Sequence, residues 1–123
     1  MAQQPNQSEN EAEKLVRDYQ MTQEQLRAAA MQLEQLQTQK AELAKAKDEV
    51  GGSTGKVYIT VGGVIVETSK EKAMTDIKDK SEFAEVRINS LTKQFNELKA
   101  KEKQLGEKLT HLYKQGQETG GVS

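Results

Sequence analysis

The sequence predicts a mainly α-helical protein, in which a long antiparallel two-helix coiled coil is joined by a single β-hairpin. Two observations predict this architecture. Apolar residues recur in alternating steps of three and four from Ala12 to Val50, and again from Met74 to Leu112, which is the spacing of coiled-coil helices. Between these stretches, residues 57–67 have strand character on both sides of Gly62-Gly63, a dipeptide that favours a tight hairpin turn.

The composition agrees with a helical seam better than with a globular core. Aromatic residues make up 4% of the 123 residues and charged residues 30%, so large apolar side chains are too few for an ordinary compact core. Ala, Glu, Lys, Leu and Gln dominate outside the middle, as in long helices. Such a chain buries its apolar residues along a seam or against partner chains.

The charge pattern and the hydropathy exclude several classes of function. The net charge is −1, with both signs interspersed, so neither nucleic acid nor an anionic membrane is an expected partner. No apolar run approaches the roughly 20 residues that a membrane span needs, and the N-terminus lacks a signal-peptide core. There is no cysteine and therefore no sign of an oxidising compartment. We expect a cytoplasmic protein.

The first helix is expected over residues 9–50, after a loose tail at residues 1–8. Its predicted seam has twelve positions: Ala12, Leu15, Tyr19, Thr22, Leu26, Ala29, Leu33, Leu36, Lys40, Leu43, Lys47 and Val50. The two lysines should loosen the seam near the hairpin. Gly51-Gly52 follows the last position, and glycine there predicts the end of the helix.

The hairpin is expected over residues 56–67. With Gly62-Gly63 as the turn, the expected cross-strand pairs are Val61 with Val64, Thr60 with Ile65, Ile59 with Val66 and Tyr58 with Glu67. One face then carries only apolar side chains: Val57, Ile59, Val61, Val64 and Val66. The other face carries Tyr58, Thr60, Ile65 and Glu67. Because a lone two-stranded hairpin is marginally stable and both of its edges are unpaired, it needs a partner.

The second helix is expected over residues 69–114, with Thr68 as its N-cap and Glu71 three residues later. Its predicted seam also has twelve positions: Met74, Ile77, Ser81, Ala84, Ile88, Leu91, Phe95, Leu98, Glu102, Leu105, Leu109 and Leu112. Gly106 lies inside this helix and should cost about 1 kcal/mol relative to Ala. Residues 115–123 are expected to form a flexible tail, and the whole chain, residues 1–123, a single domain.

The two seams have equal lengths, which predicts that the chain folds back on itself. Each seam spans 39 residues, which corresponds to a helix of about 58 Å. In an antiparallel pair, residues whose numbers sum to about 124 should lie opposite each other, such as Leu36 with Ile88 and Ala29 with Phe95.

The ends of the helices away from the hairpin carry more apolar side chains than one seam needs. We call six of them the tip residues: Leu15, Val16, Tyr19, Leu109, Leu112 and Tyr113. Met21 is a further apolar residue off the seam. Exposed apolar groups beyond a seam can mark an interaction surface, and plain seam packing is the alternative for Leu15, Tyr19 and Leu109.

No catalytic or cofactor-binding constellation is found, so the chain is not expected to be an enzyme or to hold a cofactor or metal. Gly51-Gly52-Ser53-Thr54-Gly55-Lys56 differs from a phosphate-binding loop in its glycine spacing, and Val57 follows the lysine where Ser or Thr is required. His111 is the single histidine and is expected to be a solvated residue on the helix surface. The basic run around Lys101 is expected to be a solvated helix face.

The order of helix, glycine-rich connector, hairpin and helix, with Val61-Gly62-Gly63-Val64-Ile65-Val66-Glu67 at its centre, resembles the β class of the prefoldin family. The resemblance covers residues 10–115 in architecture and residues 57–67 in motif. The α class has two hairpins, and this chain offers one.

The resemblance implies a hexamer of two α-class and four β-class subunits, in which hairpins join into a β-barrel body and the coiled coils project from it. It also implies an ATP-independent holdase co-chaperone, whose coiled-coil ends capture unfolded client proteins and deliver them to a group II chaperonin in the cytosol. The alternative function is that of a structural coiled-coil adaptor in a multiprotein complex, which holds no clients.

Overall fold

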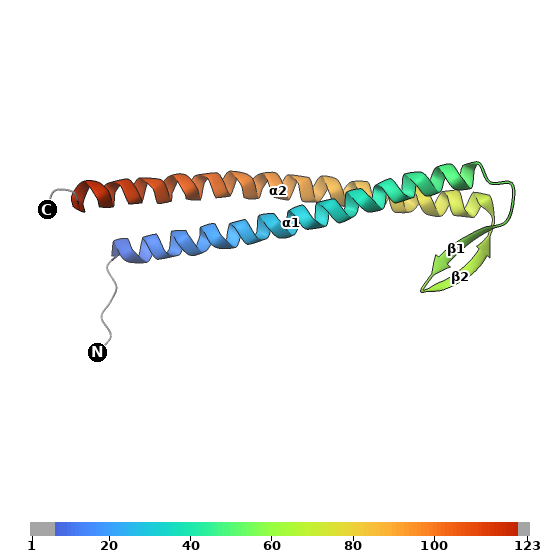
Figure 1. The fold of residues 1–123 in the computed structure, drawn as a ribbon, viewed down its shortest axis with the longest axis horizontal. Helices are drawn as coiled ribbons and strands as arrows, with labels where there is room; N and C mark the ends of the chain where they lie inside the picture. The colour runs from blue at the N-terminus through green and yellow to red at the C-terminus, as the bar shows by residue number, and fades with distance from the viewer. Residues whose placement is uncertain (1–6, 121–123) are drawn as a thin grey trace. The chain divides into compact units, whose positions relative to one another are not determined.

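In a computed structural model of the chain, residues 7–120 are described, and the side chains of residues 10–116. The order of elements is α1 (Gln7–Gly51), β1 (Val57–Val61), β2 (Val64–Thr68) and α2 (Lys70–Gly120) (Figure 1). The predicted fold class, two long helices joined by one antiparallel hairpin, is confirmed for the single chain. The parts of the predicted tails at residues 1–6 and 121–123 lie outside the described residues.

The helices and the hairpin belong to two compact units. The hairpin unit is Met31–Thr92, and the terminal unit comprises the described residues up to Ala30 and from Lys93 onward. In each unit a segment of α1 packs antiparallel to a segment of α2. The Lys40–Glu85 ion pair joins the helices in the hairpin unit, and the ring of Tyr19 reaches Gly106 in the terminal unit. Both pairs of numbers sum to 125, close to the predicted value of 124.

The predicted seams account for nearly all buried residues of the helices. All predicted seam positions are buried or half-buried except Lys40 and Lys47. Thr22 is fully buried, and its hydroxyl donates a hydrogen bond to the carbonyl oxygen of Asp18 at 2.7 Å, so its burial leaves no unsatisfied polar group. The looser packing expected near the two lysines has a counterpart in a cavity of about 260 Å³ beside Lys47, Met74 and Ile77.

The hairpin has the predicted register. Val61 pairs with Val64, Thr60 with Ile65, Ile59 with Val66 and Tyr58 with Glu67, and a fifth pair joins Val57 to Thr68. Gly62 and Gly63 have φ angles of 56° and 81°, a left-handed conformation at both turn positions that matches the twist of the strands and that side chains with a Cβ disfavour.

The N-terminus of α2 differs from the prediction by one residue. Thr68 closes the hairpin through its pairing with Val57, so the cap is Ser69, whose hydroxyl oxygen accepts a hydrogen bond from the backbone N–H of Lys72 at 3.1 Å. Glu71 then lies in the first turn, where the helix dipole favours a carboxylate. The prediction of Thr68 as the N-cap was wrong because the extra pair with Val57 makes Thr68 the last residue of β2.

Both helices are longer than predicted. α1 begins at Gln7 and includes Gly51, and α2 continues to Gly120, six residues beyond the predicted end at residue 114. A glycine ends a helix when it adopts a positive φ, and among the described glycines Gly62 and Gly63 alone do so. Gly116 therefore continues the helix, since propagating a formed helix is easier than starting one.

The connection after α1 is held by the start of α2. The Lys70 ammonium donates hydrogen bonds to the carbonyl oxygens of Gly51 at 2.8 Å and Ser53 at 3.5 Å. A cation at these carbonyls satisfies groups that the end of a helix leaves unpaired, and it complements the helix dipole. This contact joins the start of α2 to the end of α1 and to the connection that follows it.

Candidate functional site

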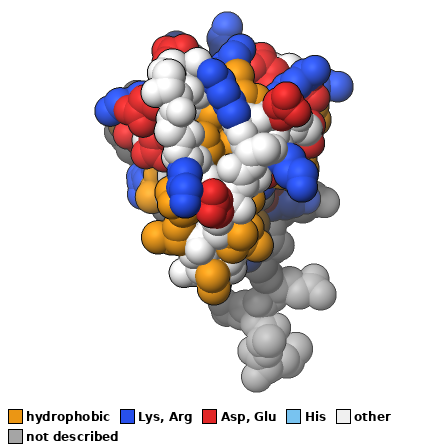
Figure 2. Space-filling model, turned by 90° about the vertical axis from the view of Figure 1, so that its right-hand side faces the viewer, with side chains coloured by type: hydrophobic (Ala, Val, Ile, Leu, Met, Phe, Trp, Pro, Cys, Tyr) orange, Lys and Arg blue, Asp and Glu red, His pale blue; other side chains and the backbone are white. Residues whose placement is uncertain are grey.

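The first candidate surface is the apolar face of the hairpin. Val57 is buried and Ile59 half-buried, whereas Val61, Val64 and Val66 are 57%, 61% and 44% exposed. The face is therefore covered at the base of the strands and open toward the turn. In Figure 2, hydrophobic side chains gather on the lower part of the molecule, over the hairpin, and charged side chains surround the upper part.

The other face of the hairpin is also partly apolar. Ile65 is 72% exposed and Tyr58 is exposed as well. Within residues 7–120 the sheet has two strands, so each strand has one edge whose backbone N–H and C=O groups have no strand partner. The hairpin thus offers two means of binding another hairpin, namely apolar side chains and free strand edges.

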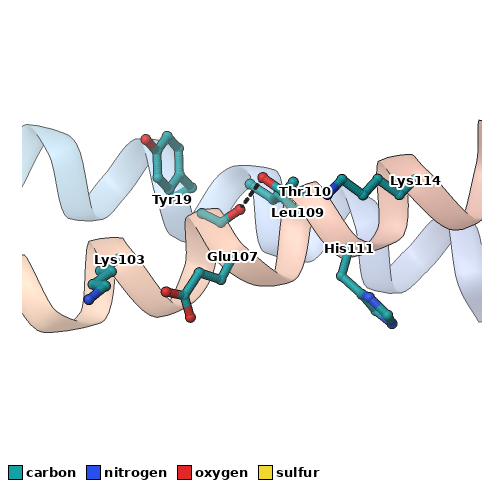
Figure 3. A pocket seen from close by; sticks show the side chains of 8 residues that line it. Tyr19, Lys103, Glu107, Leu109, Thr110, His111 and Lys114 are labelled. Atoms are coloured by element: carbon teal, nitrogen blue, oxygen red, sulfur yellow. Dashed lines mark hydrogen bonds between the residues drawn. The ribbon is translucent and has the colours of Figure 1, made fainter.

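The second candidate surface lies in the terminal unit, where open grooves border the helix pair. We call the first the Tyr19 groove, which has a volume of about 710 Å³ (Figure 3). It is lined by Tyr19 of α1 and by seven residues of α2: Lys103, Gly106, Glu107, Leu109, Thr110, His111 and Lys114. The Leu15 groove, of about 620 Å³, is lined by Glu11, Leu15, Gln104, Glu107, Lys108, His111 and Leu112.

The tip residues do not form one patch. Tyr19 and Leu109 line the first groove, and Leu15 and Leu112 the second. Val16 lines a separate hollow on α1, and Tyr113 is exposed and lines none of these three. The four seam residues of this set are half-buried, so each serves the seam and also presents part of its surface to a groove.

Glycine at position 106 shapes the Tyr19 groove. A Cβ atom at this position would lie 3.6 Å from Cε2 of Tyr19, so the aromatic ring lies against the bare backbone of α2. The Thr110 hydroxyl donates a hydrogen bond to the carbonyl oxygen of Gly106 at 2.9 Å, as the dashed line in Figure 3 shows. The floor of the groove is therefore an aromatic ring, a backbone segment and the half-buried Leu109.

Several residues of these surfaces were not predicted from the sequence. Lys103, Gly106, Lys114 and the exposed His111 line the Tyr19 groove. Lys103 and Gly106 are three residues apart, a spacing that places them on one face of α2. Met31, Phe83 and Val86 are exposed apolar residues of the hairpin unit that the seam pattern leaves outside the seam.

Neither surface brings together side chains that would hold a metal ion among the described residues. Among the residues that the structure describes, no group of three or more His, Asp or Glu side chains is placed to hold a metal ion. Within the same residues, neither helix contains a stretch long and apolar enough to span a bilayer. What the two surfaces offer is binding through apolar and charged contacts.

Comparison with known proteins assigns the family. Residues 13–116 match the family model described as "Prefoldin subunit". The chain is 38% identical over 89 residues to the prefoldin subunit beta of Pyrococcus abyssi, covering 71% of this chain and 76% of the relative. It is 40% identical over 92 residues to that of Thermococcus kodakarensis, covering 73% of each. The crystal structure of the prefoldin beta subunit from Thermococcus strain KS-1 is similar with a TM-score of 0.61 and 35% identity, over 97% of this chain and 96% of that one.

Proposed function

Because the chain belongs to the prefoldin family, whose members are non-enzymatic chaperone subunits, we propose that it is a β-class subunit of an ATP-independent holdase. In this proposal the assembled protein captures unfolded polypeptides and delivers them to a group II chaperonin in the cytoplasm. The observation that carries the proposal is that the same chain has an open, apolar hairpin face and, in the terminal unit, grooves that contain apolar side chains among charged ones.

The hairpin is the proposed site of assembly. Val61, Val64 and Val66 expose apolar surface, and burying such surface contributes about 25 cal/mol per Å². Hairpins of neighbouring subunits would cover this face and pair with the free strand edges, closing a β-barrel body. The partners are α-class and other β-class subunits, in a hexamer of two α and four β chains.

The tip residues are the proposed site of client capture. A non-native chain exposes apolar segments, and each terminal unit offers only small apolar areas, so a single contact is weak. Several such units in one assembly convert later contacts into intramolecular ones, which raises the overall affinity without any new type of contact. Binding of this kind requires no nucleotide hydrolysis, and handover follows from competition by the next chaperone.

Serine substitutions at the tip test this proposal. The variant Val16→Ser, Tyr19→Ser, Leu109→Ser and Tyr113→Ser should keep the native mass of the assembly and lose most of its ability to suppress aggregation of a denatured client, measured by light scattering. Because Tyr19 and Leu109 also pack in the seam, a second variant changes only the exposed Val16 and Tyr113. It should retain full helicity and show a smaller loss in the same direction.

A matched control removes apolar side chains elsewhere. Met31→Ser with Phe83→Ser changes two exposed residues of the hairpin unit and should leave protection of the client unchanged. Undiminished protection by the tip variants would contradict capture at the tip residues. An intact assembly that never protects a client would instead favour the structural coiled-coil adaptor.

A further inference from the structure

Three charged residues and one threonine of the Tyr19 groove lie along one line on α2. Lys103, Glu107, Thr110 and Lys114 are spaced by four, three and four residues, which places them on one face of the helix over three turns. All four line the groove (Figure 3). The groove therefore has a lysine at each end and a single carboxylate between them.

The two lysines are available to a ligand. Both side chains are exposed. Among the described side chains, the ion pairs are Lys40–Glu85 and Lys80–Asp76, and neither Lys103 nor Lys114 takes part in one. The surrounding part of α2 reinforces their charge, because residues 93–116 contain six lysines and three glutamates. Each end of this groove thus carries a positive side chain.

The distance between the lysines corresponds to a short extended peptide. Lys114 lies eleven positions after Lys103, and this is about 16 Å along a helix axis. An extended chain covers that distance in about five residues. Between the two lysines the floor consists of the Tyr19 ring, the backbone at Gly106 and Leu109, which suits apolar side chains, and Glu107 disfavours an acidic one.

We propose that the Tyr19 groove selects extended apolar segments of non-native chains that carry an acidic residue at each end, about five residues apart. This inference rests on the proposed function and adds the chemical class of client segment that this groove binds. Apolar contacts with Tyr19 and Leu109 hold the middle of the segment, and the Lys103 and Lys114 ammonium groups pair with its terminal carboxylates. Segments with basic ends are repelled.

Three labelled peptides test the selection on the assembled, full-length protein. Each has four apolar residues between two end residues, which are aspartate in the first, serine in the second and lysine in the third. Exposed ion pairs contribute modestly, so fluorescence anisotropy should show binding of the aspartate peptide about fivefold tighter than that of the serine peptide, and the lysine peptide should bind weakest. Added salt should reduce these differences because it screens exposed charges.

Charge reversal should invert the order. In Lys103→Glu with Lys114→Glu, the lysine peptide should bind tightest and the aspartate peptide weakest. The control Lys93→Glu with Lys101→Glu changes the net charge equally at exposed positions that line neither groove and should keep the original order. Lys103→Gln with Lys114→Gln provides a milder change that should make the three peptides bind equally well.

The outcomes separate this inference from the proposed function. If wild-type protein binds the three peptides equally, or binds none while still protecting a denatured client, selection by the lysines is overturned and client holding stands. If reversal at the control positions inverts the order as well, the general charge of α2 and not the groove is responsible, and the inference fails. If the wild-type assembly neither binds the peptides nor protects a denatured client, the proposed function itself is overturned.

Discussion

On the hairpin, exposed apolar side chains lie on paired strands, whereas in the terminal unit they lie on separate helical turns, most of them beside open grooves. Val61 and Val64 are direct cross-strand partners, so their exposed surfaces are contiguous on a sheet with free edges. Val16 and Tyr113 lie on different helices, and five of the six tip residues are divided among three separate hollows. The difference supports our proposal that the hairpin binds a permanent partner and that the terminal unit binds transient, varied ligands.

The seam beneath both surfaces has the same physical basis. Leu36 in the hairpin unit and Leu26 in the terminal unit are buried to a similar degree, and each lies at a predicted heptad position. The two units therefore differ in what they expose and not in how their helices are held together. The following predictions test that distinction, beginning with the largest expected effect.

Charge on the apolar face of the hairpin should abolish assembly. Ile59→Asp with Val66→Asp places two carboxylates at a cross-strand pair on the face that we propose to be covered. Sedimentation should show loss of the complex, and circular dichroism should show that most of the helicity remains. The matched control, Thr60→Asp with Ile65→Asp, places the same charges at the neighbouring pair on the opposite face and should assemble. A full complex from the first variant would exclude this face as the assembly site.

Truncation of seam leucines should destabilise both units to a similar extent. Leu26→Ala and Leu36→Ala each remove a buried side chain and should lower the free energy of unfolding by about 3 kcal/mol, measured by chemical denaturation at fixed protein concentration. Met31→Ala, at an exposed position between them, should change it by less than about 0.5 kcal/mol. A large loss in one unit and none in the other would contradict a shared basis of stability.

Two glycines should respond in opposite directions to alanine. Gly106→Ala should raise the free energy of unfolding by about 1 kcal/mol, because alanine is the better helix former and the new Cβ atom meets Tyr19 Cε2 at an ordinary 3.6 Å. Gly63→Ala should lower it by about 1 kcal/mol, because the residue has a φ of 81°. Thermal unfolding of both variants measures the difference, and a shift of the same sign in both would be inconsistent with these backbone roles.

Exchange of the Lys40–Glu85 pair tests the antiparallel register. Lys40→Glu alone should lower the free energy of unfolding by about 0.5 kcal/mol, and Lys40→Glu with Glu85→Lys should restore most of it. The control pair, Asp76 and Lys80, lies within α2 at a spacing of four residues, so its exchange reports on the helix alone. If the exchanged Lys40–Glu85 variant is no more stable than Lys40→Glu, the two side chains do not interact in solution.

Much of the fold could be predicted because heptad spacing and hairpin pairing are local rules. The seam from Ala12 to Leu112 and the register around Gly62-Gly63 follow from spacing alone. Ala73 was missed because it is buried off the heptad positions, in the first turn of α2, where tertiary neighbours and not periodicity determine burial. The end of α2 was missed because glycine does not by itself stop a helix, and Gly116 keeps a helical backbone without a positive φ.

The candidate surfaces were predictable in part. The apolar strand face follows from the alternation of residues along the strands. Its greater exposure near the turn could not be predicted, because it depends on how the hairpin packs against the helices. The tip residues were grouped because they lie within a few turns of one end of the predicted helix pair, but the direction of each side chain around its helix distributes them among separate grooves. The pairing of Tyr19 with Gly106 depends on the relative rotation of two helices, which heptad spacing sets too coarsely to predict.

Native mass spectrometry of this chain, alone and mixed with an α-class prefoldin subunit, tests the central claim most directly. The account holds that the hairpin is an assembly surface that requires partner hairpins, while the terminal unit remains available for clients. It predicts a complex of four copies of this chain and two α-class subunits. A chain that stays monomeric in the presence of the α-class subunit, or that forms oligomers excluding it, would contradict the account.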